Sequence, residues 1–148
     1  MGSILKESDR AKIVSRFQKL SPSSTRKWGS LEVTGMLQHL NLSARMTLGE
    51  LPVASSNKRV FQTFPLKHLI LYVLPFPKGA PTAAELKPAD ASSFEAERTA
   101  LLEMLARIGT GPTEGVGPAH PLFGSMTWKE RGVVTYKHAD HHLKQFGA

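Results

Sequence analysis

The stretch TWKERGVVTYKHADHHLKQFG, residues 127–147, carries the clearest folding signals of this chain. Thr127 and Glu130 have the spacing of a capping box, in which each side chain binds the backbone N–H of the other residue. Gly147 stands where a glycine commonly ends a helix. Between these signals, one helical face collects the apolar and small residues Trp128, Gly132, Thr135, Ala139, Leu143 and Phe146, and the opposite face collects Lys129, Val133, Lys137, Asp140 and Lys144. The sequence therefore predicts one long helix from Trp128 to about Phe146.

Four other segments show the helical period, at about residues 9–20, 32–50, 65–74 and 92–109. The third is short and apolar, so we expect it to be buried, with Pro65 in its first turn. In the fourth, Ser92 and Glu95 predict a second capping box, and Gly109 marks the end. No segment alternates with the strand period, and no repeat is visible. The chain is therefore predicted to be one all-α domain over residues 1–148, most simply a four-helix bundle with long connections.

The composition limits the chemistry that the chain can perform. It has 148 residues and no cysteine, which excludes disulfides, thiolate zinc sites and a cysteine nucleophile. A metal would therefore be held by histidine, aspartate or glutamate. The N-terminus is charged too early for a signal peptide, and the longest apolar run, Leu69–Leu74, is too short to span a bilayer. We expect a cytoplasmic protein with no membrane partner.

The net charge of +7 raises the question of nucleic-acid binding. The basic residues are spread along the chain, with no arginine-rich block and no aromatic platform between them. The nearest cluster is Lys12, Arg16 and Lys19, one stripe of the first predicted helix, and a solvated helix face explains it equally well. We therefore expect no nucleic-acid partner.

The histidines are the strongest candidates for a functional site. His138 and His142 are four residues apart, so they stack one turn apart at the edge of the apolar face of the last helix, whereas His141 falls among charged residues. His39 lies at the edge of the apolar face of the second helix. Three neutral imidazoles from two helices can hold one divalent cation and leave a coordination position open. The alternative is that each histidine is only hydrogen-bonded at the core boundary, since such pairs also occur by chance.

Three stretches of the chain are similar to a known group of proteins. They are WGSLEVTGMLQHL at residues 28–40, LPFPKGAPTAAEL at 74–86 and HPLFGSMTWKERGVVTYKHADHHLKQFG at 120–147. With them the chain resembles the DinB-like superfamily of metal-binding four-helix bundles, and more narrowly a bacterial branch catalogued as a domain of unknown function. The third stretch is the most specific, because His-Pro-Leu-Phe-Gly before a capped helix that ends in His-x-x-x-His rarely arises by chance.

The resemblance implies a metal triad formed by His39, His138 and His142. We expect zinc or nickel as the ion, because both accept imidazole ligands. The resemblance also implies metal-dependent transfer of a low-molecular-weight thiol, or isomerisation or hydrolysis of small substrates, although the branch itself has no settled activity. One residue departs from the pattern. Gly35 lies inside the second predicted helix, where a glycine costs about 1 kcal/mol relative to alanine, and it obscures where the helix begins.

Three residues are candidates for binding a small-molecule substrate, namely His120, Arg131 and Lys78, and the two cations among them could hold an anionic group. Arg131 is the stronger of the two cations because it lies on the His138 side of the last helix, although a surface salt bridge would also explain it. His120 precedes a proline in a loop and has no role that spacing assigns. A homodimer is compatible with these assignments.

No general base is assigned by spacing, although His120, Glu32 and His141 are candidates. Glu32 and Glu50 lie two or more turns from His39, about 10 Å or more along the helix axis, so neither is expected to complete the shell of the ion. We therefore expect an open position on the metal and an enzyme that acts on small molecules. The competing hypothesis is a metal-binding or stress-related module whose metal is structural and fully coordinated.

Overall fold

The computed structural model describes residues 1–89 and 92–148 of the chain. Its elements are the helices α1 (Glu7–Gln18), α2 (Val33–Thr47), α3 (Leu66–Tyr72), α4 (Phe94–Gly109) and α5 (Trp128–Gln145), with the short 3-10 helices η1 (Arg59–Gln62) and η2 (Ala84–Leu86). The described ranges contain two isolated backbone bridges and no strand, so the all-α prediction is confirmed. No helix in these ranges combines the length and the apolar character that a membrane crossing requires.

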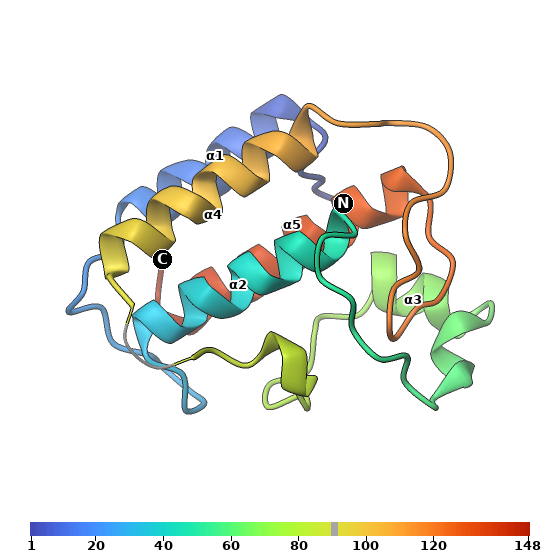
Figure 1. The fold of residues 1–148 in the computed structure, drawn as a ribbon, viewed down its shortest axis with the longest axis horizontal. Coiled ribbons are helices and arrows are strands. Elements are labelled where there is room, and N and C mark those ends of the chain that lie inside the picture. The colour runs from blue at the N-terminus through green and yellow to red at the C-terminus, as the bar shows by residue number, and fades with distance from the viewer. Residues whose placement is uncertain (90–91) are drawn as a thin grey trace.

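The four long helices pack around a common core (Figure 1). α1 and α4 lie side by side, α2 packs against α4 and α5, and α5 also contacts α1. The apolar stripes of the four helices meet inside, where they bury Ile13, Phe17, Met36, Leu37, Leu101, Leu105, Ile108 and Leu143. Burial of a large apolar side chain contributes about 1.5–3 kcal/mol, so these stripes hold the helices in register.

The capping signals of the sequence are confirmed in α5 and displaced by one residue in α4. Thr127 and Glu130 form the predicted reciprocal capping box. In α4, however, Ser93 caps the helix and accepts from the backbone N–H of Ala96, while the Ser92 hydroxyl binds Glu97. The prediction of a Ser92–Glu95 box was wrong because two adjacent serines can both serve as caps, and the sequence does not distinguish them.

The short helix α3 is less buried than predicted. It stands at one end of the bundle, with only Leu71 fully enclosed, in a small second core with Phe123 and Met126. Leu69 and Val73 of the same apolar run are exposed. The run is therefore a helix that buries one side chain, Leu71, and packs Ile70 and Tyr72 partly against the second core, because a helix at the end of a bundle has only one neighbouring face to contact.

The charged face predicted for α5 is also partly covered. Lys137 is only 8 % exposed, because α3 packs over this face of α5. Its ammonium group donates to backbone carbonyls in the last turn of α3. The helical period places Lys137 opposite the main core correctly, but it does not show that a second layer of chain covers that side.

Cationic side chains close the C-terminal ends of three helices. Arg131 donates to the carbonyl oxygen of Thr47, the last residue of α2, at 3.1 Å. Arg10 donates to the carbonyl oxygen of Gly109, the last residue of α4, at 3.2 Å. Lys137 donates to the carbonyl oxygen of Ile70 in the last turn of α3. A cation here satisfies carbonyl groups that have no partner within their helix and complements the negative end of the helix dipole.

Gly35 lies inside α2, as predicted, in the first turn of the helix, and its replacement should stabilise the protein. A β-carbon at this position would meet Pro88 Cγ at 3.4 Å, an ordinary van der Waals contact. We expect Gly35→Ala to raise the free energy of unfolding by about 0.5–1 kcal/mol, because alanine loses less backbone entropy in a helix. Urea unfolding monitored by circular dichroism would measure the change, and a lower midpoint would show that Pro88 cannot tolerate the methyl group.

Candidate metal centre

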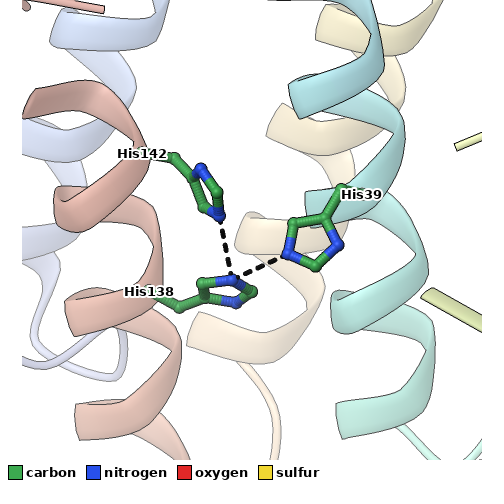
Figure 2. A group of neighbouring side chains, drawn as sticks. All are labelled: His39, His138 and His142. Carbon is green, nitrogen blue, oxygen red and sulfur yellow. Dashed lines mark hydrogen bonds between the residues drawn. The ribbon is translucent and has the colours of Figure 1, made fainter. Parts of the chain in front are cut away.

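Three histidines from two helices converge at the edge of the core (Figure 2). His39 is placed by α2, and His138 and His142 are placed one turn apart by α5. The Nε2 atom of His138 lies 2.9 Å from Nε2 of His39 and 3.2 Å from Nε2 of His142. The three candidate ligand atoms lie within 4.8 Å of one another. Helix geometry thus brings together side chains that are far apart in the sequence.

These separations suit ligands of a single small ion. Zinc–nitrogen bonds of 2.0–2.1 Å at tetrahedral angles place neighbouring nitrogens about 3.3–3.4 Å apart. The two short separations around His138 are within a few tenths of an ångström of that value. The three histidines therefore lie close enough to hold one metal ion, and within the described residues no carboxylate joins the group.

Hydrogen bonds fix the tautomers of two of the rings. Nδ1 of His39 lies 2.8 Å from the carbonyl oxygen of Leu86, which can only accept, so Nδ1 carries the proton. Nδ1 of His142 lies 2.8 Å from Oε1 of Gln145. The amide of Gln145 is oriented by its own Nε2, which donates to the carbonyl oxygen of Trp28 at 2.9 Å. Nδ1 is therefore the donor in both rings, and both Nε2 atoms present lone pairs to the centre.

Burial keeps the three rings neutral. Burial is the main cause that lowers the pKa of His39, and it lowers the pKa of His142 to about 4. The pKa of His138 is lowered well below its usual value by burial and then by the charges that His142 and His39 would carry. Neutral imidazole is the form that binds metals, so the site is ready for a cation at neutral pH.

The arrangement is suited to a cation for a further reason. With protons on Nδ1 of His39 and His142, both Nε2 atoms are hydrogen-bond acceptors that face the single Nε2 of His138. One N–H on His138 cannot satisfy two acceptors with good geometry, and buried acceptors without a donor are unfavourable. A divalent ion satisfies all three lone pairs at once.

Aromatic rings border the triad on the His138 side. The Phe76 ring lies 6.2 Å from the His138 ring and 6.3 Å from the His141 ring, measured between centroids. The Trp28 ring lies 5.9 Å from the His141 ring. We call Trp28, Phe76 and His141 the aromatic rim. His141 therefore lies beside the triad, as a member of its border and outside the converging group.

The two candidate cations occupy different places. Lys78 lies at the rim, with Nζ 4.3 Å from the centroid of the Trp28 ring. Arg131 is 2 % exposed and closes the end of α2, and Gly117 covers its guanidinium group so closely that a β-carbon there would lie 2.5 Å from Nε. Arg131 therefore caps a helix end in this structure, and the expectation that it is the better anion ligand stays a prediction.

His120 is half-buried in the loop before α5. Its Nδ1 accepts from the backbone N–H groups of Leu122 and Phe123, at 3.1 and 3.2 Å. Burial lowers its pKa to about 4, and the nearby charges of Arg131 and Lys67 act in the same direction. These bonds give His120 a clear role in shaping the turn that precedes α5.

The acidic residues that flank α2 lie away from the histidines. Glu32 precedes the first turn of α2 and pairs with Arg26. Glu50 follows the helix and pairs with Arg107 at the surface. These positions agree with the expectation, drawn from helix length, that neither carboxylate reaches an ion held by His39.

Sequence reasoning missed the partners that orient the triad. Gln145 follows His142 by three residues, which is the spacing of neighbours on a helix, so the pattern contained a signal for it. The carbonyl oxygen of Leu86, at the end of η2, and the ring of Phe76 come from the connection between α3 and α4, where no periodic pattern indicated them.

The comparisons with known proteins agree with the narrower part of the resemblance. A model of a protein family described as a protein of unknown function, DUF1569, matches residues 4–148. No curated protein and no solved structure matches the chain. The family model covers nearly the whole helical bundle, including all three converging histidines. The chain is therefore a member of the DUF1569 family.

Proposed function

We propose that this protein binds one divalent metal ion, zinc or nickel, through His39, His138 and His142, and acts as a DinB-like enzyme on small molecules. The observation that carries the proposal is the convergence of the Nε2 atoms of three neutral histidine rings. In two of these rings, His39 and His142, Nδ1 already donates a hydrogen bond, so Nε2 is free to bind the ion. Three nitrogen ligands without a fourth protein ligand are characteristic of catalytic zinc sites, whereas structural sites are closed by four.

The proposed chemistry is transfer of a low-molecular-weight thiol or hydrolysis of a small substrate. An ion with an open position lowers the pKa of a thiol or a water molecule that binds there. The chain itself supplies the orientation of the ligands, since Leu86 holds the His39 ring and Gln145 holds the His142 ring. Phe76 lies beside the His138 ring and Trp28 beside the His141 ring, so both rings form part of the border of the proposed site.

A second candidate function is a non-enzymatic module with a structural metal. The observation that favours it is the burial of His39 and His142, which are 5 % and 7 % exposed. His138 is more accessible than either of them. The two candidates differ in one measurable property, namely whether an external ligand can reach the ion.

Cobalt substitution would distinguish the two functions. The visible spectrum of the cobalt-loaded protein should change when a small thiol is added, because a thiolate that enters the open position adds a sulfur ligand. It should also change with azide and with pH. A spectrum that is indifferent to thiols, azide and pH would indicate a closed structural site and would contradict the enzymatic proposal.

A further inference from the structure

The triad has a pronounced excess of positive charge around it once an ion is bound. Three neutral imidazoles leave the charge of a divalent ion uncompensated. Asp140 lies between the two α5 histidines in the sequence, but its carboxylate pairs with Arg16 at 2.7 Å and with Lys144 at 2.7 Å. Among the described residues, Lys78 has no carboxylate within 4.0 Å. Negative charge on a ligand would therefore favour its binding at this site.

The local backbone holds Lys78 beside the aromatic rim. Pro77 precedes it and limits the backbone, and Gly79, with φ of +73°, completes a turn directly after it. Phe76, two residues earlier, packs against the His138 and His141 rings and anchors the segment to the rim. The Lys78 side chain is exposed, and its ammonium group lies over the Trp28 ring. Such a contact contributes about 0.5–1 kcal/mol and leaves the donors of the ammonium group free for a ligand.

We propose that Lys78, held over Trp28, recognises an anionic group on the small thiol that occupies the open metal position. The thiol would thus be a molecule that carries a carboxylate or a similar acidic group in addition to its sulfur. This inference rests on the proposed function. It adds that the metal selects the sulfur and that the rim selects the acidic group.

The geometry favours Lys78 over two buried cations, Arg131 and Lys137, for this role. Arg131 donates to Thr47 and is covered by Gly117. Lys137 donates to carbonyl groups of α3 and is 8 % exposed. Each of these two cations already closes a helix end and is enclosed by the chain. Lys78 combines exposure with a position on the aromatic rim.

The test compares two thiols of similar size on the cobalt-loaded full-length protein. The first is 2-mercaptoethanol, and the second is 2-mercaptoethanesulfonate, which adds an acidic group that is itself a poor metal ligand. We expect the second thiol to bind about two- to fivefold more tightly at low ionic strength, the range that an exposed ion pair supplies. This preference should shrink as salt is added. The absorbance of the sulfur–cobalt bands gives both dissociation constants.

Two variants test whether Lys78 is the source of the preference for 2-mercaptoethanesulfonate. Lys78→Met should reduce the preference for 2-mercaptoethanesulfonate while leaving binding of 2-mercaptoethanol unchanged, because only the attraction of the bound ion for the acidic group then remains. Lys129→Met removes the same charge from the start of α5, where Lys129 pairs with Glu114, and should retain the preference. Equal binding of the two thiols to the unmodified protein, or a preference that is undiminished in Lys78→Met, would overturn the inference and leave the proposed function intact. Cobalt bands that respond to neither thiol would overturn the thiol function and this inference with it.

Discussion

His39→Ala and His142→Ala should each remove nearly all tightly bound metal, whereas the unmodified protein should retain about one ion per chain. Each variant deletes one of three converging ligands. We expect metal affinity to fall by more than about 100-fold, because loss of an outer-shell partner alone costs 10–100-fold. Elemental analysis of protein purified without a histidine tag and without added nickel would measure the metal content per chain.

Two control variants make this prediction specific. His141→Ala removes the neighbouring histidine, which lies on the rim, and should keep the metal. Gln145→Leu leaves all three ligands but frees Nδ1 of His142, so its affinity should fall between those of the other variants. Loss of metal in His141→Ala together with retention in His142→Ala would show that the ligands are assigned wrongly.

Lowering the pH from 7 to 5 should strongly destabilise the protein after its metal is removed with a chelator. The pKa values of His120 and His142 are about 4 in the folded chain, against 6.5 in the unfolded chain. Below pH 6.5 the unfolded state therefore binds protons that the folded state does not, and stability is lost as the pH falls towards 4. Each of these histidines contributes a loss of about 2 kcal/mol at pH 5. The lowered pKa values of His39 and His138 act in the same direction.

Urea unfolding at the two pH values would measure this loss, with His120→Asn as the matched control. Asparagine can accept the backbone N–H groups of Leu122 and Phe123 through its side-chain oxygen, but it does not titrate. The variant should therefore lose about 2 kcal/mol less than the unmodified protein between pH 7 and pH 5. A ring proton of His120 that titrates near pH 6.5 by NMR would contradict the prediction.

The fold was largely predictable because its signals are local. The apolar stripe and the capping box of α5 are contained within residues 127–147, and each long helix carries a similar stripe. The misjudged features depend on distant packing. Lys137 belongs to a charged face by period, yet α3 covers it because the chain returns to that side of the bundle. Long cationic side chains reach helix ends that no spacing rule connects to them.

The candidate site was predictable to the extent that helices build it. The structure brings together the three histidines that helical geometry selects, because rings at the core edge of two adjacent helices must face each other. The rim comes from Trp28 and Phe76, in irregular segments that lie far from α5 in the sequence. Their positions depend on how these segments fold onto the bundle, which no periodic pattern records.

The separation of the ligands along the chain has a consequence for the lifetime of the protein. An ion shared by His39 and His138 would tie together two positions 99 residues apart, in a chain that has no cysteine to form a permanent link. Such a link closes a long loop and is reversible, so the stability that it adds depends on the concentration of the free ion. At a free ion concentration 100 times the dissociation constant, the folded state gains about 2.7 kcal/mol. A cell that withdrew the ion would loosen α2 from α5 and raise the fraction of chains open to proteolysis.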